Sequence, residues 1–219
     1  MAEAPPLALS ERRTFTYRLC AALVSGLAKV LFRPSVEGAT HIPLEGPVII
    51  APIHRSNVDF ALTLFISKRK VFFMAKDSLF RVPVLGPLIT HLGAFPIHRG
   101  SADRESMAHS EAVLRDGHAL VLFPEGTRKE GRSVAPLHDG AMFMAARTGA
   151  KVVPVGIGGS EQAMPKGAKL PRPARIRIVV GEPLDPPSSK GRVTRSALSA
   201  KSEELRVALE RVYHESLQN

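Results

Sequence analysis

The sequence predicts an α/β fold with a mixed, mostly parallel sheet of about six or seven strands, covered by helices. The first observation behind this prediction is that short apolar, β-branched runs recur along most of the chain. The second is that stretches with helical periodicity lie between these runs, as in sheets whose strands are joined through helices. The third is a mostly apolar helical pattern ahead of the first run, which predicts an N-terminal amphipathic helix at a membrane interface.

The N-terminal pattern covers residues 14–33, and Pro34 ends it. Large apolar residues recur at every fourth position, while Arg18 and Lys29 fall on a narrow polar strip beside them. This pattern is typical of a helix that lies in the membrane surface. A helix packed on the domain's own core and a signal peptide are the alternatives, whereas a spanning helix would need ~20 predominantly apolar residues. We therefore expect residues 1–33 to associate with a membrane and residues 34–219 to form one α/β domain.

The remaining elements follow from the alternation of patterns. Strands are expected at residues 48–51, 71–75, 94–97, 119–123, 152–157 and 176–180, and helices at residues 57–67, roughly 84–92, 104–116 and 140–148. Leu198, Leu205, Leu209 and Val212 indicate a final amphipathic helix. Pro154 predicts that its strand lies at a sheet edge or contains a bulge, because proline cannot donate a ladder hydrogen bond.

Composition limits the classes of partner. The 219 residues carry 30 Lys and Arg against 20 Asp and Glu, and the resulting net charge of +10 favours an anionic partner. A nucleic acid is not expected, because the basic residues are scattered and stacking aromatics are scarce. A single cysteine excludes an internal disulfide, and no histidine or cysteine cluster has the spacing of a zinc site. We therefore expect no metal.

His54 and Asp59 form the first candidate site, in an H-x-x-x-x-D pattern directly after the strand at 48–51. Histidine can take a proton near neutral pH, and a carboxylate can orient it and stabilise the imidazolium. The two side chains can meet if His54 lies in the turn after the strand and Asp59 in the first turn of a helix. Ser56 would then be the N-cap of that helix, so a plain capping carboxylate and a loop histidine fit the same residues.

Two further turns carry candidate ligand-binding residues. Phe123-Pro124-Glu125-Gly126-Thr127-Arg128 follows an apolar strand, where α/β proteins often place ligand-binding loops. Arg128 could bind a phosphate, Thr127 could donate a hydrogen bond, and Glu125 could orient either. A surface Glu–Arg pair in an ordinary turn is the alternative. Arg99 follows another short strand, in Gly93-Ala94-Phe95-Pro96-Ile97-His98-Arg99, and could also reach a ligand. A solvated surface arginine is the alternative for this residue.

The order H-x-x-x-x-D, G-x-F-x-x-x-R, F-P-E-G-T-R and V-V-P-V resembles the motif blocks of the glycerolipid acyltransferases. Within these the chain is most similar to the 1-acylglycerol-3-phosphate (lysophosphatidic acid) acyltransferases, over residues 36–160. The resemblance implies His54 as general base and Asp59 as the carboxylate that orients it. It further implies acceptor binding by the remaining motif residues, Arg99, Glu125, Gly126, Thr127 and Arg128.

The same resemblance implies an enzyme that moves an acyl group from acyl-CoA or acyl carrier protein to a lysophosphatidic acid hydroxyl, without a cofactor. It implies a peripheral or monotopic protein on the cytoplasmic face of the cell membrane. Ile53, Arg55, Pro96 and His98 depart from the usual motifs and leave the acceptor open. Acylation of glycerol 3-phosphate or another lysophospholipid is the alternative within the family. A non-catalytic basic protein that binds membranes or nucleic acid is the alternative outside it.

Overall fold

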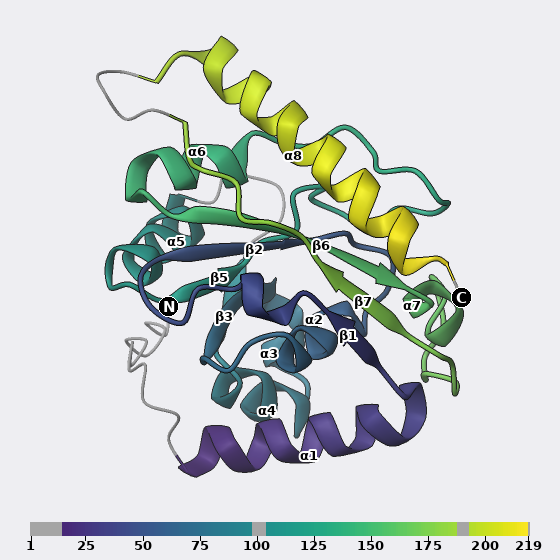
Figure 1. Ribbon diagram of the computed structural model, residues 1–219. Coiled ribbons are helices and arrows are strands. Elements are labelled where there is room, and N and C mark those ends of the chain that lie inside the picture. Colours follow the sequence, from purple (N-terminus) through teal and green to yellow (C-terminus); the bar gives the residue numbers. More distant parts are fainter. Residues whose placement is uncertain (1–14, 98–103, 188–192, 219) are drawn as a thin grey trace.

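The computed structural model describes residues 15–97, 104–187 and 193–218, and these form one seven-stranded sheet with helices on both faces (Figure 1). The strand order is β1-β7-β6-β2-β5-β3-β4. The strands are β1 (Ser35–Glu37), β2 (Val48–Pro52), β3 (Val71–Lys76), β4 (Ala94–Ile97), β5 (Ala119–Val121), β6 (Lys151–Gly158) and β7 (Arg177–Val180). The predicted mixed, mostly parallel sheet is confirmed.

Five neighbouring strands of the sheet run in one direction, and the other two run in the opposite direction. β4, β3, β5, β2 and β6 run parallel, so their carboxyl ends share one edge, which we call the carboxyl edge. β7 is antiparallel to β6, and β1 is parallel to β7, so these two strands begin at that edge. In open parallel sheets the turns beyond the carboxyl ends are where ligands bind.

Helices cover the two faces in separate groups. The helices are α1 (Phe15–Phe32), α2 (Asp59–Leu62), α3 (Asp77–Phe80), α4 (Leu85–His91), α5 (Arg104–Arg115), α6 (Gly140–Thr148), α7 (Ser160–Ala163) and α8 (Arg195–Ser216), with 3-10 turns at η1 (Ala39–His41) and η2 (Thr63–Phe65). Figure 1 shows α5, α6 and α8 over one face, and α1, α2 and α4 over the other.

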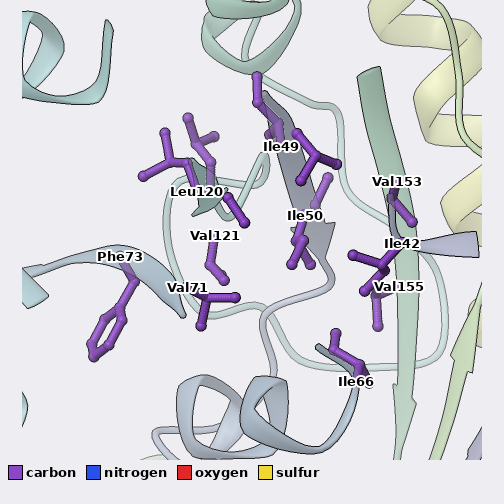
Figure 2. Packing of buried hydrophobic residues seen from close by; sticks show 14 of the residues in the cluster. Ile42, Ile49, Ile50, Ile66, Val71, Phe73, Leu120, Val121, Val153 and Val155 are labelled. Carbon is purple, nitrogen blue, oxygen red and sulfur yellow. The ribbon is translucent and has the colours of Figure 1, made fainter. Parts of the chain in front are cut away.

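The core lies on both sides of the central strands. All five residues of β2 are buried, and the side chains of β2, β5 and β6 interleave in Figure 2. A strand buried on both faces has no polar positions, which is why residues 48–51 appear in the sequence as a continuous apolar run. α8 adds Leu205, Leu209 and Val212 to this core, as its pattern predicted.

Some predicted elements differ from the structure. The helix expected at 57–67 is the short α2 followed by η2. The helix expected at roughly 84–92 is confirmed as α4, but the separate α3 before it was not predicted. The strand expected at 119–123 ends at Val121. β1 was missed because it is three residues long and exposes Ser35 and Glu37, which leaves no apolar pattern to detect.

Pro154 lies inside the sheet, so the edge position is wrong. β6 has β2 on one side and β7 on the other, and Pro154 pairs with Ala51 of β2. The bulge alternative describes the other side, where Val153 and Pro154 face the three residues Gly181, Glu182 and Pro183 between two paired positions. The proline therefore sits where the ladder is already interrupted.

α1 has one packed face and one exposed face. Tyr17, Ala28 and Phe32 are buried against the domain, while Phe15, Leu19, Leu23, Leu27 and Val30 are exposed on the other side. Within the described residues, α1 is long and apolar enough to cross a membrane by length and composition, a test that core helices and signal sequences also pass. The expected N-terminal apolar helix is present, and a domain boundary at residue 33 stays a prediction.

Candidate active site

His54 lies in the turn beyond β2, at the carboxyl edge. Its Nδ1 is 3.0 Å from Asp59 Oδ2, and its ring stacks on Phe123 with the ring centroids 4.1 Å apart. The carboxylate can only accept, so the neutral ring carries its proton on Nδ1. Nε2 then presents a lone pair and has no hydrogen-bond partner among the described residues. The structure therefore brings the two predicted residues together in the geometry of a base and its orienting acid.

Asp59 also holds the backbone of the His54 turn. Its side chain is fully buried, and Oδ2 accepts from the N–H groups of Arg55 at 2.8 Å and Ser56 at 2.7 Å. The predicted N-cap is wrong: the residue before the helix is Val58, and the Ser56 hydroxyl donates to Met164 O at 2.9 Å. Asp59 thus fixes both the imidazole and the loop that carries it, so the capping and catalytic interpretations are compatible.

Glu125 is buried under the same turn. Oε2 accepts from the His54 N–H at 3.0 Å and from Arg55 Nη1 at 2.7 Å, while Oε1 accepts from the Ala135 N–H at 3.1 Å. Both carboxylate oxygens are therefore used within the protein. The carboxylate that begins the E-G-T-R motif joins the β2 turn to the β5 turn, and its ion-pair partner is Arg55 rather than Arg128.

Arg55 is buried and donates only to the protein. Besides Glu125, it donates to the carbonyl oxygens of His54, Gly131 and Ser133, and its guanidinium lies 5.0 Å from the centroid of the Tyr213 ring. Burial lowers the pKa of Arg55, but the ion pair with Glu125 outweighs this effect and raises the pKa above its ordinary value. The buried guanidinium therefore links the backbone of His54 to the loop that contains Gly131 and Ser133.

The turn after β5 is tied to the His54 turn and leaves two donors available. The Lys129 N–H donates to His54 O at 2.9 Å. Gly126 has φ +70°, and a Cβ there would lie 2.8 Å from the ring of His138, so both the conformation and the close approach favour glycine. Thr127 is exposed. Arg128 is partly buried, and its Nη1 has no hydrogen-bond partner among the described residues.

Not every predicted site residue can be placed. Arg99 lies outside the described residues. The described residues contain no group of three or more potential metal ligands. The sequence did not predict the ion pair of Arg55 with Glu125, the contact of Arg55 with the Tyr213 ring on α8, or the stacking of Phe123 on His54. Only Arg55 had a visible signal, as a charged residue next to the histidine.

Comparison with known proteins gives consistent results. A model of the acyltransferase family matches residues 33–158. The chain is 25% identical over 177 residues to the chloroplastic 1-acyl-sn-glycerol-3-phosphate acyltransferase LPAT1 of Arabidopsis thaliana, over 79% of this chain and 49% of that protein. It is 26% identical over 190 residues to the 1-acyl-sn-glycerol-3-phosphate acyltransferase of Bacillus subtilis, over 86% of this chain and 92% of that protein.

A solved structure agrees with the sequence matches. The crystal structure of the 1-acyl-sn-glycerophosphate (LPA) acyltransferase PlsC from Thermotoga maritima superposes with a TM-score of 0.76 and 26% identity, covering 94% of this chain and 82% of that one. The chain spans about half the length of the plant relatives it matches.

Proposed function

The chain belongs to the acyltransferase family, and on that premise we propose that it transfers a fatty acyl group from a thioester to 1-acylglycerol 3-phosphate. The product would be phosphatidic acid, made at the cytoplasmic face of the cell membrane. The names of the similar proteins support this acceptor. The observation that carries the proposal is the 3.0 Å contact between His54 Nδ1 and Asp59 Oδ2, which leaves Nε2 available as a base.

His54 acts on the acceptor hydroxyl. Nε2 takes the hydroxyl proton as the oxygen attacks the thioester carbonyl, and Asp59 stabilises the imidazolium that forms. The tetrahedral intermediate collapses by breaking the carbon–sulfur bond. The imidazolium then returns its proton to the departing thiolate, so the enzyme ends the cycle unchanged. A thioester is already activated, and no cofactor is required by this scheme.

Arg128 binds the acceptor phosphate. Its Nη1 has no partner in the part of the chain that the structure describes, and the turn that carries it is joined to His54 by the Lys129 N–H, so a phosphate bound there is held near the base. Thr127 adds a hydroxyl donor, Gly126 gives the turn its shape, and Arg99 is expected to contribute a second cation. Fixing the phosphate selects which hydroxyl reaches Nε2.

Glu125 and Arg55 are positioning residues in this proposal. They contact the backbone of His54 and of the loop after Arg128, and neither directs a free polar group toward the acceptor. Their buried ion pair keeps the base and the phosphate-binding turn at a constant separation, which is the requirement for a near-attack geometry.

A product assay tests the function. The purified full chain is supplied with acyl-CoA or acyl carrier protein as donor, and with lysophosphatidic acid, glycerol 3-phosphate or another lysophospholipid as acceptor. Mass spectrometry is expected to find phosphatidic acid as the main product. Lysophosphatidic acid from glycerol 3-phosphate would instead establish the alternative acceptor. Absence of any acylated product, with binding to vesicles or nucleic acid retained, would make the chain a non-catalytic binding protein.

A further inference from the structure

We propose that residues 79–84, which comprise the end of α3 and the turn that leads to α4, insert into an anionic lipid surface beside the active site. This turn exposes three large apolar side chains: Leu79 is 39%, Val82 is 42% and Val84 is 82% exposed. The neighbouring Phe80 and Leu85 pack against the core, so the turn has an anchored side and an apolar outer side. The inference rests on the proposed function, because an enzyme with a lipid acceptor needs contact with the membrane at its active site.

The turn lies at the same edge of the sheet as His54. β3 ends at Lys76 and α3 begins at the next residue, so residues 79–84 follow directly from the carboxyl edge. β3 is separated from β2 by β5 alone, and a strand spacing of about 4.8 Å places the ends of β2 and β3 about 10 Å apart. A membrane touching this turn would therefore lie close to the turns that carry His54 and Arg128.

The backbone of the turn is strained at its most exposed residue. Val84 has φ +68° and ψ −49°, and the Leu85 N–H donates to Pro83 O at 2.8 Å, which closes a γ-turn of the rare positive-φ form. For a β-branched residue this conformation is a marked outlier. The strain is held by the surroundings: Val82 O accepts from the Gly86 N–H, and a Cβ on Gly86 would lie 2.2 Å from Phe80 O. A strained backbone with a solvent-facing valine at its tip gives the isolated domain no packing benefit, which indicates a contact outside it.

Two features indicate that the turn contacts a lipid surface: the cations beside it and the apolar outer face of the neighbouring α1. Lys76 and Arg81 are exposed on either side of the apolar tip, and Arg81 approaches Asp77 only at 3.8 Å. Cations that flank apolar side chains can reach anionic headgroups while the apolar groups insert. α4, which continues from the turn, packs against α1, whose outer face is also apolar. A second copy of this chain is a poor occupant, since both copies would carry a charge of +10.

Vesicle binding by the full chain tests the proposal without requiring turnover. The probe is a vesicle of equimolar phosphatidylcholine and phosphatidylglycerol, and the variant is Val82→Asp with Val84→Asp. The matched control is Leu44→Asp with Val207→Asp, which makes the same charge change at exposed apolar residues away from the carboxyl edge. We expect vesicle affinity to fall at least roughly tenfold for the first pair and much less for the control pair. Equal losses in both would overturn the proposal, because they would show an effect of net charge alone.

Val84→Gly separates membrane contact from structure. Glycine adopts positive φ freely, so this variant is expected to keep or raise the midpoint of thermal unfolding while weakening vesicle binding. Unchanged vesicle binding would contradict the proposal. So would a raised KM for acyl carrier protein with vesicle binding intact, since the turn would then contact the donor. Failure of the proposed function is distinguishable, because the unmodified chain would make no acylated product whether or not these variants alter vesicle binding.

Discussion

The turns that follow β2 and β5 each carry an arginine, yet the protein holds the two arginines in different ways. Arg55, after β2, is buried, and its guanidinium donates to Glu125 and to three carbonyl oxygens. Arg128, after β5, is partly buried and has a buried Nη1 without a partner among the described residues. An arginine that is saturated by the protein cannot bind a ligand strongly, whereas an unsatisfied one is costly until something binds to it. In the proposed mechanism, this difference makes Arg55 part of the scaffold and Arg128 the residue that binds the acceptor.

Among these variants, Asp59→Asn is expected to have the largest effect on activity, because it removes the charge that orients the base. The amide oxygen can still accept from the N–H groups of Arg55 and Ser56, so the β2 turn should keep its shape. The imidazolium loses its stabilising carboxylate, and we expect kcat to fall by roughly 10²–10⁴-fold. Steady-state kinetics on a variant with native circular dichroism provides the measurement. A rate near that of the unmodified protein would limit Asp59 to holding the backbone of the β2 turn.

Arg55→Met tests whether Arg55 stabilises the fold through its ion pair with Glu125. Removing one partner leaves the Glu125 carboxylate buried and unpaired, and we expect the free energy of unfolding to fall by about 3–5 kcal/mol. Denaturant unfolding measures the change. Arg206→Met removes partly exposed ion pairs with Glu203 and Glu210 and should leave stability nearly unchanged.

A second variant keeps the Arg55 prediction testable if the single variant does not fold. Replacing both partners, Arg55→Met with Glu125→Gln, removes the buried charge and should recover part of the lost stability. If the double variant were no more stable than the single one, Arg55 would contribute through its carbonyl contacts rather than through the ion pair.

Arg128→Ala has the smallest expected effect and tests whether Arg128 binds the acceptor phosphate. A hydrogen bond to a charged group is worth enough to raise KM for the phosphorylated acceptor by roughly tenfold to hundredfold. KM for the acyl donor and the midpoint of thermal unfolding should change little, because Arg128 Nη1 has no hydrogen bond to lose within the described part of the chain. Arg132→Ala, at an exposed position in the same loop, is the matched control. Equal increases in both KM values would count against a phosphate site.

The sequence predicted the features that depend on local patterns. The central strands appear as apolar runs because both of their faces are buried, and the pairing of His54 with Asp59 needs only a strand, a turn and a helix in succession. Features that depend on the sheet order could not be predicted. Arg55 pairs with Glu125, which is 70 residues away in the sequence, and the Tyr213 ring on the last helix contacts the same guanidinium. The strained Val84 has no local signal either, since nothing in the sequence demands a positive φ at a valine.

The turnover of His54→Ala is the most direct test of the account. His54 is partly exposed, and Asp59 keeps its hydrogen bonds to the β2 turn without the imidazole, so the variant should fold like the unmodified protein. With an acyl thioester and 1-acylglycerol 3-phosphate, phosphatidic acid formation should fall by at least roughly 10²-fold at unchanged thermal stability. A folded variant that forms phosphatidic acid at close to the original rate would contradict a mechanism in which His54 is the base.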